Sequence, residues 1–100
     1  MRSRYAAYAC AAVDYVLGTT HPEGPHFERE RSAWRASVAE FCAQTSFLGL
    51  AILSVEPGAE EGWVTFRATL EQGGRDASFT ERSRFLRVGG RWLYHSGVAG

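Results

Sequence analysis

One hundred residues fit one small domain, and 45% hydrophobic with 22% charged residues is ordinary for a soluble globular chain. The 11 Lys and Arg balance the 11 Asp and Glu, so the zero formal net charge gives no overall attraction to nucleic acid or to an acidic membrane. No apolar run approaches the roughly 18–20 residues of a membrane-spanning helix. We therefore expect neither nucleic acid nor a membrane as a partner.

Residues 1–46 have the spacing of helices. Asp14 interrupts the apolar run that follows the basic start, which favours a helix over a signal peptide. We expect Asp14 to cap a second short helix after a bend near residues 11–13, and the Gly18-Thr19-Thr20 segment to end it. The residues that recur at intervals of three and four, and so form one apolar, aromatic face, are Tyr5, Tyr8, Ala9, Ala12, Tyr15 and Val16.

The segment HPEGPHF, residues 21–27, carries two prolines and a glycine, which predicts a loop. Ser32 is then expected to cap a third helix. Trp34, Val38 and Phe41 follow at positions i, i+4 and i+7, so this helix has one apolar face.

Residues 47–97 have the pattern of β-strands. Four segments, 47–56, 62–71, 77–88 and 91–97, are separated by short glycine-rich turns, which predicts an antiparallel meander. In the second segment Val64, Phe66, Ala68 and Leu70 alternate with polar residues and share one face. Helices followed by an antiparallel sheet indicate an α+β fold with the helices packed on one face of the sheet.

The two cysteines, Cys10 and Cys42, are far apart in the chain and lack the spacing of a metal site. Two isolated thiols, both expected to be buried, suit a reducing compartment. We therefore predict a cytoplasmic location.

The stretch FTERSRFL, residues 79–86, places a carboxylate on an apolar strand face. Phe79, Glu81, Ser83 and Phe85 share one side of the strand, and two phenylalanines usually point into a core. A buried carboxylate lowers the stability of a protein by several kcal/mol, unless it is paired with a cation, neutralised by a proton or open to a water-filled cavity. Three alternatives remain: an ion pair with an arginine of the first helix, a pocket carboxylate, and a shift of register that leaves Glu81 in solvent.

The basic residues of the same strand point the other way. Arg82 and Arg84 share the outer face with Thr80. Because the chain is neutral and few lysines lie nearby, we expect a solvated or dimer-facing sheet surface there and no nucleic-acid stripe.

Several longer stretches resemble the central domain of the YchJ family. They are MRSRYAAYACAAVDYVLGTTHP, FLGLAIL and ERSRFLRVGGRWLYHSG, and together they cover nearly the whole chain. The resemblance implies a nuclear-transport-factor-2-like (NTF2-like, or SnoaL-like) fold, in which helices pack in the concave face of a curved four-stranded antiparallel sheet that forms a cone with a pocket. It implies no established activity.

Family members usually also carry a Cys-rich SEC-C motif that is thought to bind zinc. The present sequence has no Cys-Pro-Cys stretch, so we expect residues 1–100 to form a single domain without that motif, with no metal site and no cofactor. The sequence also departs from the family at His95-Ser96, where an aliphatic residue and Asp are more common.

The fold that the resemblance implies gathers polar and aromatic residues around its pocket. The ligand-pocket candidates are Glu81, Ser83, Tyr5, Tyr8, Trp34, Trp92, Tyr94 and Arg4. We expect a binding or accessory module that recognises a small molecule or another protein. We also expect two copies of the chain to pair through the sheet as a homodimer.

Two other functions stay open. One is a small acid–base enzyme of isomerase, cyclase or hydratase type, in which Glu81 acts with His21 or Tyr94. The other is a purely structural domain. Open space beside Glu81 would favour binding or catalysis, whereas a salt bridge from Glu81 to Arg4 without a cavity would favour a structural role. His26 is expected to be solvated.

Overall fold

The amino-terminal half of the chain forms three helices, as the spacing of its apolar residues predicts. The computed structural model describes residues 1–100, and its helices are α1 (Arg2–Ala9), α2 (Val13–Gly18) and α3 (Arg31–Gln44). The bend between α1 and α2 lies where it was expected, at Ala11, whose φ of 54° is left-handed and stops α1. The helices are short, and none could cross a membrane.

Both predicted helix caps are wrong. Ala12 occupies the N-cap of α2, and Asp14 lies in the first turn, where it pairs with Arg35 at 2.8 Å. The N-cap of α3 is Glu30, whose carboxylate accepts a hydrogen bond from the backbone N–H of Ser32 at 3.0 Å. A carboxylate two residues earlier thus takes the acceptor role that the serine hydroxyl was expected to fill.

The carboxyl-terminal half forms a curved antiparallel sheet. Its long strands are β1 (Thr45–Glu56), β2 (Glu61–Gln72), β4 (Phe79–Val88) and β5 (Arg91–Ala99), in the order β1-β2-β4-β5. A two-residue strand, β3 (Arg75–Asp76), pairs with the end of β2 inside the segment predicted to be only a turn. The predicted α+β class and the four-stranded antiparallel meander are confirmed.

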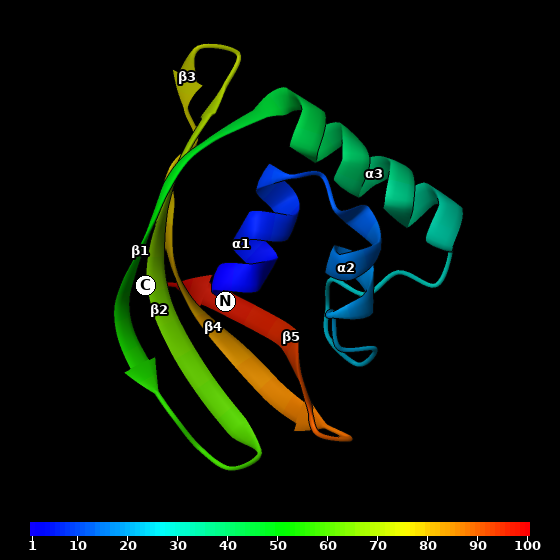
Figure 1. The fold of residues 1–100 in the computed structure, drawn as a ribbon, viewed down its shortest axis with the longest axis vertical. Coiled ribbons are helices and arrows are strands. Elements are labelled where there is room, and N and C mark those ends of the chain that lie inside the picture. Colours follow the sequence, from blue (N-terminus) through cyan, green and yellow to red (C-terminus); the bar gives the residue numbers. More distant parts are fainter.

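The sheet curls around the helices. Figure 1 shows α1 inside the concave face, with α2 and α3 closing its open side. Register shifts in β1, between Phe47 and Gly49 and between Ile52 and Ser54, add to the bending, because a bulge bends the strand that contains it.

The apolar core is divided between the two layers. The helices bury one cluster, which contains Ala7, Val16, Leu17, Trp34 and Val38. The concave face buries a second cluster of Phe66, Ala68 and Leu70, three of the β2 residues that alternation placed on one face. The space where the two clusters face each other is not completely filled.

The segment after α2 joins the helices to the last strand. The backbone N–H of Tyr94 donates to the carbonyl of Thr19, and the N–H of His21 donates to the carbonyl of Tyr94, both at 2.8 Å. Thr20 thereby forms a parallel bridge with Tyr94. These bonds fix the end of α2 against β5.

Arg82 and Arg84 lie on the outer face of the sheet, as the alternation predicted, and there they form ion pairs that the sequence did not predict. Arg82 donates from Nε and Nη2 to the two carboxylate oxygens of Glu56, at 2.9 and 2.8 Å, and Arg84 donates to Glu61 at 2.6 Å. The Arg82 guanidinium also lies 3.9 Å from the ring centre of Trp63. Carboxylates of β1 and β2 therefore neutralise Arg82 and Arg84 locally, whereas Arg87 forms no ion pair.

Candidate functional site

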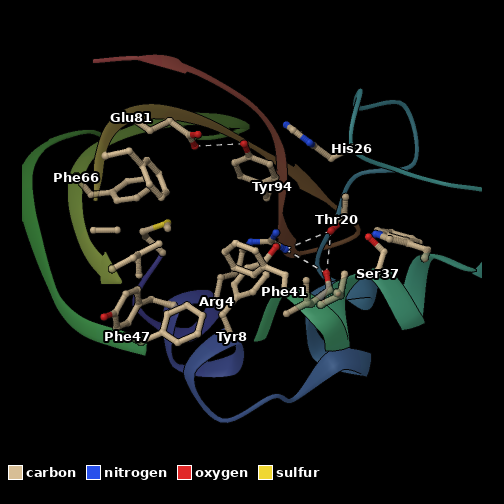
Figure 2. Close-up of a pocket in the computed structure, with 18 of the residues that line it drawn as sticks. Arg4, Tyr8, Thr20, His26, Ser37, Phe41, Phe47, Phe66, Glu81 and Tyr94 are labelled. Carbon is tan, nitrogen blue, oxygen red and sulfur yellow. Dashed lines mark hydrogen bonds between the residues drawn. The ribbon is translucent and has the colours of Figure 1, made fainter. Parts of the chain in front are cut away.

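A cavity of about 380 Å³ lies between the helices and the concave face of the sheet. This volume is within the range of about 300–1,000 Å³ that is usual for small-molecule sites. Figure 2 shows its open centre, with Phe66, Glu81 and Tyr94 along the sheet and Arg4, Tyr8 and Phe41 along the helices. Of its 19 lining residues 13 are hydrophobic, so the walls are mainly apolar.

Glu81 reaches this cavity from β4, on the same strand face as the buried Phe85. The Ser83 hydroxyl donates to its Oε2 at 2.5 Å, and the Tyr94 hydroxyl donates to the same oxygen at 3.2 Å. The other carboxylate oxygen, Oε1, accepts no hydrogen bond from the protein and is not sealed from the cavity. The predicted ion pair with an N-terminal arginine does not form, and neither does the register shift into solvent.

Gly97 on β5 leaves room for that carboxylate. It pairs across the strands with Ser83, and a Cβ at this position would collide with the Glu81 side chain at Cγ, Cδ and Oε2. The absence of a side chain at residue 97 is therefore part of how Glu81 is placed.

Arg4 is buried on the helical side of the cavity, with 6% of its surface exposed. Its Nη1 donates to the carbonyl of Val16 at 3.2 Å, to Thr19 Oγ1 at 2.7 Å and to Thr20 Oγ1 at 3.3 Å. No carboxylate lies within ion-pair distance. Burial lowers the pKa of Arg4, but a guanidinium stays protonated at any physiological pH.

Tyr94 lies between the two charges. Its ring centre is 4.7 Å from the guanidinium carbon of Arg4, while its hydroxyl binds Glu81. Burial, followed by the charge of Glu81 and the hydrogen bond to it, raises the pKa of Tyr94 well above its usual range. The phenol therefore keeps its proton and acts as a donor at neutral pH.

Two further tyrosines from α1, Tyr5 and Tyr8, line the cavity. The ring centre of Tyr8 is 5.9 Å from the Arg4 guanidinium carbon, and burial raises the pKa of Tyr8. The hydroxyl of Tyr5 is buried without a hydrogen-bond partner. A buried polar group without a partner is unusual in a folded protein, and this hydroxyl is closed off from the open space of the cavity.

The structure brings most of the predicted pocket residues together. Arg4, Tyr5, Tyr8, Trp34, Glu81 and Tyr94 all line the cavity. Ser83 is fully buried behind Glu81 and acts through its hydrogen bond to that carboxylate. Trp92, on β5, lies outside the lining and is 42% exposed; its ring reaches across β4 toward Gly62 of β2.

His21 and Glu81 are not brought together. His21 is buried in the loop, where its Nδ1 accepts the N–H of Glu23 at 3.0 Å and its ring faces that of His95 with 5.3 Å between centres. His21 is not part of the cavity lining. His26, which we expected to be solvated, is exposed but also lines the cavity, with its ring centre 5.6 Å from that of Tyr94.

The sequence missed two groups of cavity residues. The first is Thr20, which with the adjoining Thr19 was interpreted only as a helix stop, whereas both hydroxyls accept hydrogen bonds from Arg4. The second consists of phenylalanines from four different elements, namely Phe41, Phe47, Phe66 and Phe79. The alternating pattern had placed Phe66 and Phe79 on inner faces, but nothing in the sequence indicated that all four meet.

The cysteines do not behave as a buried pair. Cys10 is exposed at the end of α1, which corrects the expectation of two buried thiols, and Cys42 is partly buried against the helical cluster. Burial raises the pKa of Cys42, which lowers the share of its reactive thiolate form at neutral pH.

Comparison with known proteins gives the same family over almost the whole chain. The family model of the YchJ middle NTF2-like domain matches residues 1–97. A curated relative, a UPF0225 protein from Pectobacterium carotovorum, is 44% identical over 98% of the chain. The chain spans 63% of the length of that relative.

Solved structures share the fold. A SEC-C motif-containing protein from Rhodopseudomonas palustris is 35% identical, with a TM-score of 0.84 over all of the chain and 75% of that protein. A solved protein named as a variant of Rd1NTF2_05 is 12% identical, with a TM-score of 0.76 over 99% of the chain and 91% of that protein, and so resembles it in fold alone.

Proposed function

The chain belongs to the YchJ family, whose middle NTF2-like domain it forms, and on that premise we propose that it is a binding module for a small molecule. The ligand would occupy the cavity between the helices and the curved sheet. Aromatic walls would bury its apolar part, and the few polar groups of the cavity would orient it.

The observation that carries this proposal is the state of Glu81. Its carboxylate turns toward open space, has one oxygen without a protein partner, and is bonded to Ser83 and Tyr94 instead of an arginine. A purely structural carboxylate would instead be expected in an ion pair in a filled core. The cavity beside Glu81 therefore supports binding over a structural role.

The test is binding of neutral aromatic probes such as phenol and indole, followed by NMR chemical shifts of backbone amides. We expect shifts concentrated at the cavity lining. Ala68→Leu narrows the cavity and should weaken binding severalfold, because Ala68 is a buried lining residue. Ala51→Leu on the exposed part of β1 is the matched control and should leave binding unchanged. Shifts scattered over the surface, or none at millimolar probe, would refute the proposal.

Acid–base catalysis is a second candidate that one observation favours. Tyr94, a protonated phenol, is hydrogen-bonded to Glu81 inside the cavity, so a donor and a carboxylate base lie side by side. In heavy water, an enzyme of this kind would exchange the acidic C–H proton of a bound carbonyl compound for deuterium, and Glu81→Gln would abolish the exchange. Binding without exchange would leave the module as a binder only.

Two further proposals concern the setting of the domain. A homodimer through the outer sheet face would appear as a doubled mass in sedimentation. A cytoplasmic location is supported by two free thiols, one of them exposed, since such thiols persist in reducing compartments.

A further inference from the structure

Arg4 is a buried cation that lacks an anion. All of its hydrogen bonds run from Nη1 to neutral acceptors, namely Val16 O, Thr19 Oγ1 and Thr20 Oγ1. Its Nε and Nη2 donate no hydrogen bond of normal geometry and keep some accessible surface, and the Tyr8 hydroxyl is the one further polar group of the protein that acts on the guanidinium at short range. Since isolated buried charges are costly and a guanidinium binds carboxylates with two parallel hydrogen bonds, this free edge fits a carboxylate.

Glu81 does not serve as that carboxylate. Its Oε2 is taken by Ser83 and Tyr94, and its free Oε1 can only accept a hydrogen bond while the group is ionised. The cavity therefore has a cationic pole, Arg4, that can donate hydrogen bonds to a ligand, and an anionic pole, Glu81, that can accept one. A ligand matching both has a carboxylate at one end and a hydroxyl or amino group at the other.

The spacing of the two poles is set by Tyr94. Its ring lies on the Arg4 guanidinium, and its hydroxyl, at the far end of the same ring, touches Glu81. Figure 2 shows Glu81 at the hydroxyl end of Tyr94, with Arg4 and Thr20 on the other side of the ring. The Tyr94 ring therefore separates the two poles, and a benzene ring with substituents at opposite ends is a rigid scaffold that could reach from one to the other.

The remaining lining suits such a ring. Phe41, Phe47 and Phe66 offer aromatic surface to it. Edge and face contacts between aromatic rings contribute beyond their burial alone. The cavity volume of about 380 Å³ is ample for one substituted ring.

We propose that the cavity binds small aromatic carboxylates that carry a hydroxyl or amino group at the opposite end of the ring, with the carboxylate on Arg4 and the donor on Glu81. This rests on the proposed function, because it assigns a chemical class to the ligand of the same cavity.

The test compares three probes by NMR titration of the 100-residue chain. They are para-hydroxybenzoate, which has both groups; para-hydroxybenzamide, which lacks the negative charge; and benzoate, which lacks the donor. We expect para-hydroxybenzoate to bind tightest, with the other two weaker by about tenfold, as expected for loss of one charge-assisted contact. This order is measured on the unaltered protein and needs no variant.

Substitutions then assign each end of the probe. Arg4→Gln should weaken para-hydroxybenzoate by about tenfold and leave para-hydroxybenzamide nearly unchanged, because only the first uses the charge. Glu81→Gln should weaken the binding of para-hydroxybenzoate, whose hydroxyl loses its ionised acceptor. The affinity for benzoate should stay equal or increase, since the substitution removes a charge that repels the carboxylate. Arg2→Gln, at an exposed arginine of the same helix, is the matched control and should change nothing. Dispersed amide spectra establish that each variant is folded.

Two outcomes overturn the inference, and they differ. Neutral probes that bind in the cavity as tightly as para-hydroxybenzoate would refute the ligand class and leave the binding module standing. Failure of every aromatic probe to shift the cavity residues would refute both proposals.

Discussion

At the scale of single residues, two opposite charges line one cavity without pairing. Arg4 is held by threonine hydroxyls and a carbonyl, and Glu81 by a serine and a tyrosine. These neutral partners use some of the hydrogen-bonding atoms of each charged group and leave others without a partner. Such an arrangement costs some stability and leaves hydrogen-bonding capacity for a ligand.

Glu81→Gln should therefore cost little stability. The amide oxygen can still accept from Ser83 and Tyr94, so we expect a loss of about 1 kcal/mol, or about 4–8 °C in melting temperature for a domain of this size. Thermal unfolding followed by circular dichroism measures it. A loss of about 3–5 kcal/mol, the cost of breaking a buried ion pair, would show that Glu81 has an arginine partner after all.

Gly97→Ala should act through Glu81. The new methyl group would displace the carboxylate from Ser83, so we expect a loss of about 1–3 kcal/mol, typical of overpacking. The same substitution in a Glu81→Ala background should cost clearly less, because the group it collides with is gone. Equal costs in the two backgrounds, measured by urea unfolding, would mean that the strand itself rejects alanine at position 97.

The sequence predicted which residues face the cavity at this site better than it predicted their hydrogen-bond partners. Alternation along residues 79–85 placed Glu81 and Ser83 on the inner face, where the structure has them. It could not choose between an arginine and Tyr94 as the partner of Glu81, because that depends on where α1 and β5 meet in space. Gly97 carried no signal at all, since its role is the volume that it leaves empty.

At the scale of elements, the loop after α2 docks against β5 by close backbone contact. Gly24 is buried, and a Cβ there would collide with the backbone carbonyl of His95. That carbonyl belongs to the backbone of β5 and cannot move away as the end of a flexible side chain could. The loop therefore helps to hold the end of α2, and with it the threonines around Arg4, against the sheet.

Gly24→Ala should destabilise the protein by about 1–3 kcal/mol and should also lower the affinity of the cavity for its probes. Gly18→Ala, at the end of α2, is the matched control. Nothing lies within 4 Å of the position its Cβ would take, so it should be neutral or add up to about 1 kcal/mol, since alanine favours helix over glycine. Chemical denaturation measures the stability of both variants. Equal effects would mean that the contact of the loop with β5 does not hold the end of α2 in place.

Secondary structure was predicted well where periodicity decided it. The inner faces of β2 and β4, the three helices and the bend at Ala11 all followed from spacing or composition. The caps failed, because Ser32 and its neighbour Glu30 are both acceptors near a helix start and only geometry selects one. β3 failed because two residues give no alternation to detect.

At the scale of the whole molecule, the fold separates its apolar core into two clusters and keeps a cavity where they meet. Arg4, Thr20, Glu81 and Tyr94 come from segments far apart in the chain and share one space only after the sheet curls. No local pattern encodes that convergence. Only the resemblance to a known family anticipated a pocket, and the cavity lies where a cone of this kind would have one.

Stability should fall as the pH drops below neutral, partly through His95. Its Nδ1 lies 2.8 Å from Ser96 Oγ and its ring faces His21. Burial, then the charges of Arg84 and His21, lower the pKa of His95 below its ordinary 6.5, while Glu23 acts weakly in the opposite direction. Between these two values the unfolded chain binds more protons than the folded one, so the free energy of unfolding decreases as the pH falls through 6.5 toward the folded pKa.

His95→Gln should remove this contribution. Urea unfolding at a series of pH values from 7.5 to about 5 stays above the range in which Glu56 and Asp76, whose pKa values are also lowered, begin to take up protons. We expect the wild-type protein to lose more stability over this interval than the variant does, because glutamine does not titrate. Parallel curves for the two proteins would mean that His95 is as free to protonate in the folded chain as in the unfolded one, and the acid sensitivity would then have to come from other groups.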